Sequence, residues 1–108
     1  MQIGEGTEFV ISVQADWACA WIRPEGDVDA LTAPLLSRAV DQALERGVRK
    51  VHLWLNGVPF MDPTGIQMLT GADERARSQR SKLILHSPHP AVRELLYQTP
   101  GSETLIIK

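Results

Sequence analysis

LNGVPFMDPTGIQML, residues 55–69, joins a predicted strand to a predicted helix. The strand covers residues 50–55, where apolar residues alternate with His52 and Trp54, a pattern typical of an interior strand covered on both faces. The helix begins near Ile66 and continues to about Arg80. Strand, loop and helix in this order indicate an α/β fold, in which functional residues gather at the strand-to-helix junctions.

Toward the N-terminus, the pattern predicts a β-hairpin made of residues 8–13 and 17–23. A loop rich in Pro, Gly and Asp follows, and then an amphipathic helix. Asp29 or Thr32 is its expected N-cap, Pro34 lies early in its first turn, and Gly47 ends it.

Toward the C-terminus, the sequence predicts a strand at residues 82–86, a third helix opened by Pro90 and a last strand at 104–107. On the second helix, the solvent side is expected to carry residues 73–75 and Arg77. The predicted order is β-β-α-β-α-β-α-β. Right-handed crossovers make the later strands parallel, so we expect an α/β fold with a mixed sheet of about five strands and about three or four helices.

Length and composition exclude several classes of protein. A chain of 108 residues is expected to form a single domain, 1–108. With 11 basic and 13 acidic residues and a net charge of −2, it has no basic stripe for nucleic acid and no electrostatic attraction to a membrane. No apolar run is long enough for membrane insertion. Cys19 is the only cysteine and the N-terminus lacks signal-peptide features, so we expect a cytoplasmic protein.

The loop at residues 62–65, Asp-Pro-Thr-Gly, is the strongest candidate for chemistry. A helix N-terminus presents unpaired N–H groups and the positive end of the helix dipole, so a phosphate on Thr64 would be well placed. Gly65 leaves this backbone unshielded. A purely structural interpretation is also open, in which Asp62 or Thr64 caps the helix and Gly65 only permits a tight turn.

Two segments together resemble the STAS domain family of anti-sigma factor antagonists and their relatives. The family's phosphorylation segment, F-[IM]-D-S-[ST]-G before a helix, is similar to FMDPTG at residues 60–65. The family's G-[ED]-[LIV]-D segment is similar to GDVD at residues 26–29, and a T-A-P-x-L-like pattern follows from Thr32. The resemblance implies a STAS-like mixed sheet over the whole chain.

The resemblance also implies a function. Thr64 would be phosphorylated by an anti-sigma factor serine/threonine kinase, a phosphatase would reset it, and only the unphosphorylated protein would bind the kinase and so release a sigma factor. The expected partner-binding residues are Asp27, Asp29, Asp62, Pro63, Thr64 and Gly65. Pro63 replaces the family's usual small hydroxyl residue and stiffens the loop, and Trp54 stands where Asp or Asn is common.

Two alternatives stay open. In the first, the domain is a non-catalytic STAS subunit of a signalling complex or of an ABC lipid transporter, and Thr64 only packs against a partner. In the second, Asp27, Asp29 and Asp62 hold Mg²⁺ and an aspartate accepts the phosphoryl group, as in receiver domains. Nucleotide-binding and nucleophile motifs are absent, so we expect no enzyme activity and no cofactor.

The remaining chemically interesting residues are expected to be structural. His86 ends the predicted strand and His89 follows beyond Pro88, so this segment is interpreted as a strand end leading into a solvated loop rather than as a metal site. His52 is expected to pack or hydrogen-bond on its strand, and Cys19 to be a small, buried or half-buried hydrophobic residue. We expect Trp17, Trp21 and Trp54 to serve as core or partner-facing anchors, and Arg75, Arg77, Arg80 and Lys82 to form a solvated charged face.

Overall fold

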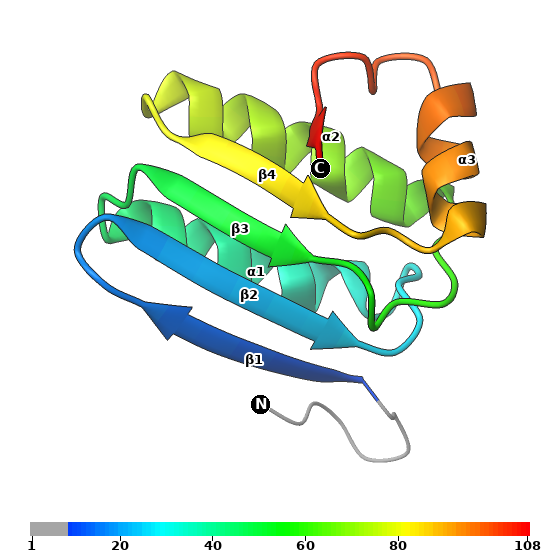
Figure 1. Cartoon of the computed structure of the whole chain (residues 1–108), viewed down its shortest axis with the longest axis horizontal. Helices are drawn as coiled ribbons and strands as arrows, with labels where there is room; N and C mark the ends of the chain where they lie inside the picture. Colours follow the sequence, from blue (N-terminus) through cyan, green and yellow to red (C-terminus); the bar gives the residue numbers. More distant parts are fainter. Residues whose placement is uncertain (1–8) are drawn as a thin grey trace.

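The computed structural model describes residues 9–108, and Figure 1 shows a sheet with helices packed against it. Glu8, where the first strand was expected to begin, lies outside the described residues. The elements are β1 (Val10–Ala15), β2 (Cys19–Glu25), α1 (Ala33–Glu45), β3 (Lys50–Trp54), α2 (Pro63–Ser78), β4 (Lys82–His86), α3 (Pro90–Gln98) and β5 (Ile106–Ile107).

The sheet is mixed, as predicted, and its strand order is β1-β2-β3-β4-β5. β1 and β2 form the antiparallel hairpin, and the other neighbouring strands are parallel. In the parallel part, Trp21 is the register partner of His52, and Trp54 is the register partner of His86. These side chains therefore lie on the same face of the sheet.

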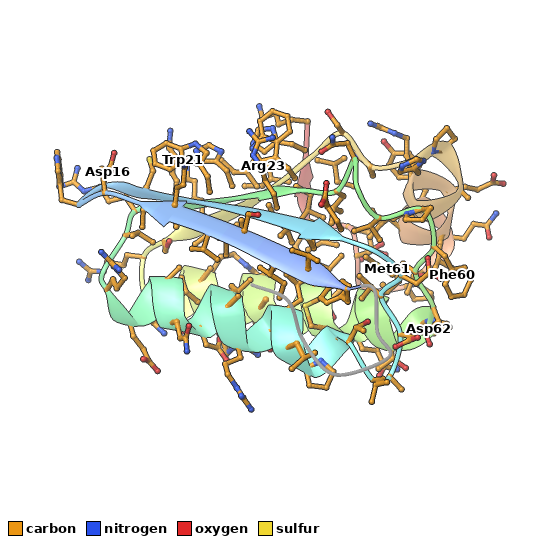
Figure 2. All side chains as sticks on the ribbon, turned by 90° about the horizontal axis from the view of Figure 1, so that it is seen from below. Asp16, Trp21, Arg23, Phe60, Met61 and Asp62 are labelled. Carbon is orange, nitrogen blue, oxygen red and sulfur yellow. The ribbon has the colours of Figure 1, made fainter. Side chains whose placement is uncertain are left out.

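α1 and α2 pack side by side on one face of the sheet, and the core lies between them and the strands (Figures 1 and 2). Its largest side chains include Ile11, Ile22, Leu53 and Leu85 from the strands and Leu36, Ile66 and Leu69 from the helices. The expectation that β3 is covered on both faces is wrong, because no described helix packs on its other side. Instead, Trp and His rings of neighbouring strands cover one another there.

The boundaries of α1 follow from its capping residues. Thr32 stands at the N-cap position, and Pro34 lies in the first turn as predicted. Asp29 stabilises this start from three residues upstream, because its carboxylate accepts hydrogen bonds from the N–H groups of Leu31 and Thr32. Gly47 follows the helix with φ of +80°, a left-handed conformation that favours glycine and ends the helix.

The solvent face predicted for α2 needs one correction. Asp73 is buried, with 1% of its surface exposed. Its carboxylate accepts hydrogen bonds from Nε of Arg77 at 3.0 Å and from the hydroxyl of Thr104 at 3.2 Å. The segment that leads to β5 therefore covers this side of α2, which sequence periodicity did not reveal. β5 is also two residues shorter than predicted and begins at Ile106.

Candidate functional site

The two segments singled out in the sequence, residues 26–29 and 60–65, are joined by backbone hydrogen bonds. The N–H of Val28 donates to the carbonyl of Phe60 at 3.0 Å, and the N–H of Asp62 donates to the carbonyl of Val28 at 3.1 Å. Val28 and Met61 thereby form a short parallel β-bridge beyond the ends of β2 and β3. Both side chains are buried, so the two loops form one rigid unit at the carboxyl edge of the sheet.

Asp62 is the N-cap of α2. Its backbone is extended, and its Oδ1 accepts a hydrogen bond from the N–H of Gly65 at 3.1 Å. Pro63 occupies the first helical position, where its fixed φ suits the helix and its missing N–H costs nothing. The capping interpretation is therefore confirmed for Asp62.

Thr64 occupies the second position of α2, and its side chain is exposed. The first turn of a helix has N–H groups without a partner inside the helix. Here Pro63 has none and Gly65 donates to Asp62, which leaves the N–H of Thr64 as the remaining donor of this turn. Its hydroxyl makes no hydrogen bond with the described part of the chain and is free to react.

Asp29 uses its carboxylate within its own loop. Oδ1 accepts from the N–H groups of Leu31 at 2.9 Å and Thr32 at 3.1 Å. These backbone donors, that of Thr32 first, lower the pKa of Asp29 below its ordinary value. The hydroxyl of Thr32 donates to the carbonyl of Asp27 at 2.7 Å and completes the turn. Asp29 therefore fixes the shape of the loop, while the Asp27 side chain is exposed.

An acidic cluster for a metal ion is not assembled from Asp27, Asp29 and Asp62. Two of the three carboxylates accept hydrogen bonds from backbone N–H groups of their own loops. Within residues 9–108, no group of three or more His, Cys, Asp or Glu side chains is arranged to hold a metal ion. The geometry therefore gives the receiver-like alternative no support.

Apolar surface borders the loop, a feature that the sequence analysis did not single out. Phe60 is 52% exposed and Leu31 is 70% exposed, and Figure 2 shows Phe60 beside Met61 and Asp62 at the end of the molecule. A cavity of about 430 Å³ separates this loop from α3, and a second, of about 300 Å³, lies beside Thr64 between α1 and α2. The signal in the sequence was a phenylalanine inside a loop, where the apolar periodicity of the core does not require one.

The histidines lie away from this loop. His86 ends β4, as predicted for the strand at residues 82–86, and its Nε2 lies 2.8 Å from Nδ1 of His52. The predicted hydrogen-bonded packing of His52 is thus confirmed. The exposed ring of His89, at the N-cap of α3, contacts the carbonyl of Asn56 at 2.7 Å. Cys19 is half-buried as expected.

The tryptophans differ in solvent exposure, and Arg75 forms an ion pair that the sequence did not suggest. Trp17 is 80% exposed, whereas Trp21 and Trp54 are half-buried on the sheet. Arg75 is not simply solvated: its Nε lies 2.7 Å from Asp41, and this ion pair links α2 to α1.

None of the helices within residues 9–108 has the length and apolar character of a membrane span.

Comparison with known proteins agrees with this architecture. The chain is 29% identical, over 77% of its length and 73% of the relative's, to the anti-sigma-B factor antagonist of Listeria monocytogenes. A crystal structure of an anti-sigma factor antagonist from Mycobacterium paratuberculosis is similar with a TM-score of 0.81 and 18% identity, covering 97% of this chain and 89% of that one. The Bacillus cell fate determinant SpoIIAA in its phosphorylated form has a TM-score of 0.70 and 17% identity, covering 92% and 91%.

The match to a family model covers nearly all of the described chain. Residues 11–107 match the model of the STAS domain, from the start of the hairpin to the end of β5. The mixed five-stranded sheet, the bridged loops and the capped start of α2 all lie within this match. The chain therefore belongs to the STAS domain family.

Proposed function

We propose that this protein is an anti-sigma factor antagonist that is switched by phosphorylation of Thr64. In its unphosphorylated form it binds an anti-sigma factor serine/threonine kinase through the bridged loops around Asp27, Asp29 and residues 62–65. The kinase phosphorylates Thr64, the complex dissociates, and a phosphatase restores the free hydroxyl. The names of the Listeria and Mycobacterium relatives and the phosphorylated SpoIIAA neighbour support this proposal.

One observation carries the proposal: Thr64 presents a free, exposed hydroxyl in the first turn of a rigidly held helix. The loop that carries it is held by Asp62 and by the bridge between Val28 and Met61. A kinase could reach this hydroxyl without unfolding any part of the domain. The phosphate would meet the free N–H of Thr64 and the positive end of the α2 dipole.

Phosphorylation would change binding more than folding. It adds a charge of about −1.5 to −2 at pH 7 close to the Asp62 carboxylate. The helix N-terminus offsets part of this repulsion, so the fold should tolerate the modification. A partner docked over the apolar surface near Phe60 would have to desolvate the new charge, which is costly. Release of the partner without refolding follows from this difference.

Incubation with the cognate kinase and Mg-ATP, followed by mass spectrometry, tests the phosphorylation site. We expect one phosphate on Thr64 and none on a Thr64→Ala variant. Thr70 lies on the same helix and provides the matched control, because Thr70→Ala should leave phosphorylation unchanged. Modification at another residue would contradict the proposal.

Binding to the kinase tests the switch. A Thr64→Glu variant should bind at least about tenfold more weakly than wild type, since a fixed charge must be desolvated in the complex. Thr70→Glu introduces the same charge on the same helix and should bind as wild type. Equal binding by wild type and Thr64→Glu would overturn the switch. Co-purification with a transporter ATPase instead of a kinase would favour the alternative of a transporter subunit.

A further inference from the structure

The outward face of β2, β3 and β4 is not covered by any helix in the described part of the chain. Figure 2 shows Trp21 and Arg23 projecting from the sheet on the side opposite α1 and α2. We call this surface the open face; the residues that define it are Cys19, Trp21, Arg23, Glu25, Lys50, His52, Trp54, Lys82, Ile84 and His86. It shares no side chain with the loops around Thr64.

The rings of the open face stack sideways across the strands. The ring of Trp54 lies against that of His86, with centroids 4.3 Å apart and planes 13° apart, and the guanidinium of Arg23 lies 4.9 Å from the Trp54 centroid. His52 lies parallel to Trp21, with planes 11° apart and centroids 6.0 Å apart, and also contacts His86. The faces of the Trp54 ring are therefore occupied by His86 and Arg23.

The charge of the open face is strongly biased toward cations. Lys50 and Lys82 are register partners on adjacent strands, although like charges placed directly opposite each other destabilise a sheet. Among the described residues neither lysine has a carboxylate partner, since the ion pairs there are Arg75–Asp41 and Arg77–Asp73. The only acidic side chain at an outward position of β2, β3 or β4 is Glu25, at the end of β2.

The polar groups of this face are mainly hydrogen-bond donors. Arg and Lys side chains only donate, and so does the indole of Trp. The Nε1 of Trp54 is buried and has no acceptor in the described part of the chain. A surface rich in donors and cations is complementary to a ligand rich in acceptors and negative charge.

We propose that the open face is a docking surface for an extended, acidic segment of a partner protein. Its carboxylates would lie over the Lys50–Lys82 pair and near Arg23, where they relieve the repulsion between the two lysines. A sheet surface with laterally stacked rings accepts an extended chain without rearrangement. The match in charge supplies specificity and a fast encounter with the partner.

Other occupants fit the same surface less well. Single-stranded nucleic acid stacks its bases on free aromatic faces, and the Trp54 ring is already flanked by His86 and Arg23. A membrane requires protruding apolar groups, but the large exposed hydrophobic residues, Val13, Trp17, Leu31, Phe60 and Tyr97, all lie outside the open face.

The test uses the whole protein and a ten-residue peptide of alternating Glu and Ser, with a Gln and Ser peptide as the uncharged control. In ¹⁵N-resolved NMR titrations, we expect shifts at β2, β3 and β4 and at the indole N–H of Trp21, and none along α1 or α2. Lys50→Glu should weaken binding at least about tenfold, and Lys82→Glu should do the same.

Arg38→Glu makes the same charge change on an exposed position of α1 and should alter binding less than about twofold. The proposal is overturned if the Glu peptide causes no shifts at about 1 mM, or if Arg38→Glu weakens binding as much as Lys50→Glu. It is also overturned if oligothymidylate or phosphatidylglycerol vesicles bind while the Glu peptide does not.

Discussion

Gly65 lies so close to Val28 that a Cβ at position 65 would be 2.9 Å from Cγ1 of Val28. The same Cβ would also collide with the side chain of Met61. Gly65 is therefore required by packing, because α2 begins directly against the bridge that joins the two loops. Its role is structural, and the position of Thr64 depends on this contact.

Replacing Gly65 with Ala should destabilise the protein. The added methyl group overpacks the bridge, and we expect a loss of about 1–3 kcal/mol in the free energy of unfolding, measured by urea denaturation. Gly71→Ala is the matched control on the same helix. There the new Cβ would lie 3.3 Å from Nη1 of Arg75, a milder contact than those with Met61 and Val28 at position 65, so this change should cost less stability than Gly65→Ala. Equal effects of the two substitutions would contradict the packing argument.

The cap and the phosphorylation site should be separable by mutation. Asp62→Ala removes the side-chain acceptor for the N–H of Gly65 and should cost about 1 kcal/mol of stability. Thr64→Ala removes an exposed hydroxyl and should stay within about 0.5 kcal/mol of wild type. Chemical denaturation of both variants provides the measurement. A larger loss for Thr64→Ala than for Asp62→Ala would show that Thr64 is the true cap.

Burial of Asp73 predicts a second large effect on stability. Asp73→Ala leaves the hydroxyl of Thr104 and the guanidinium of Arg77 without their acceptor, and we expect a loss of about 1–3 kcal/mol. Its neighbour Glu74 is exposed, so Glu74→Ala should change stability by less than about 0.5 kcal/mol. Thermal unfolding of the two variants compares them directly. If both were neutral, the covered position of Asp73 would be wrong.

The His52–His86 pair predicts that the free energy of unfolding decreases as the pH is lowered. Burial is the main cause that lowers the pKa of both rings. The charge of Lys50 lowers the pKa of His52 further, and the charges of His52 and Lys108 lower the pKa of His86 further. Trp21 and Trp54 are the aromatic neighbours of the pair. Because the unfolded chain then binds protons more readily than the folded one, stability is complete above the unfolded pKa of 6.5 and is lost as the pH falls through the lowered folded values.

The free energy of unfolding should therefore decrease between pH about 7.5 and about 5. A double variant with His52→Gln and His86→Gln should lose most of this slope. His89→Gln alters a histidine outside the pair and should keep it. A slope that survives in the double variant would assign the pH dependence to other groups.

Local sequence predicted much of the fold, as α2 and β4 illustrate. Residues 82–86 form a strand with the predicted bounds, and Asp62 caps α2 as one of the two predicted caps, although the helix begins at Pro63 rather than near Ile66. These features depend on neighbours within a few residues, which a pattern in the sequence contains. The position of Thr64 in the first turn followed for the same reason.

Contacts between distant segments were beyond such patterns. Asp73 was placed in solvent because its neighbours are charged, but Thr104, 31 residues away, helps to bury it. His52 and His86 meet across 34 residues only because β3 and β4 pair in one particular register. The alternation of His52 and Trp54 was attributed to a second covering layer, because a sequence does not show that rings can cover one another.

The position of the helices has a consequence for how many partners the domain can hold. Since α1 and α2 both lie on one side, the far side of the sheet and the loop end with Thr64 are separate surfaces with no side chain in common. Occupancy of one does not by itself block the other. Under the two proposals made above, a domain of 108 residues would act as an adaptor, retained in an assembly through its sheet while a second protein engages or modifies its loop end.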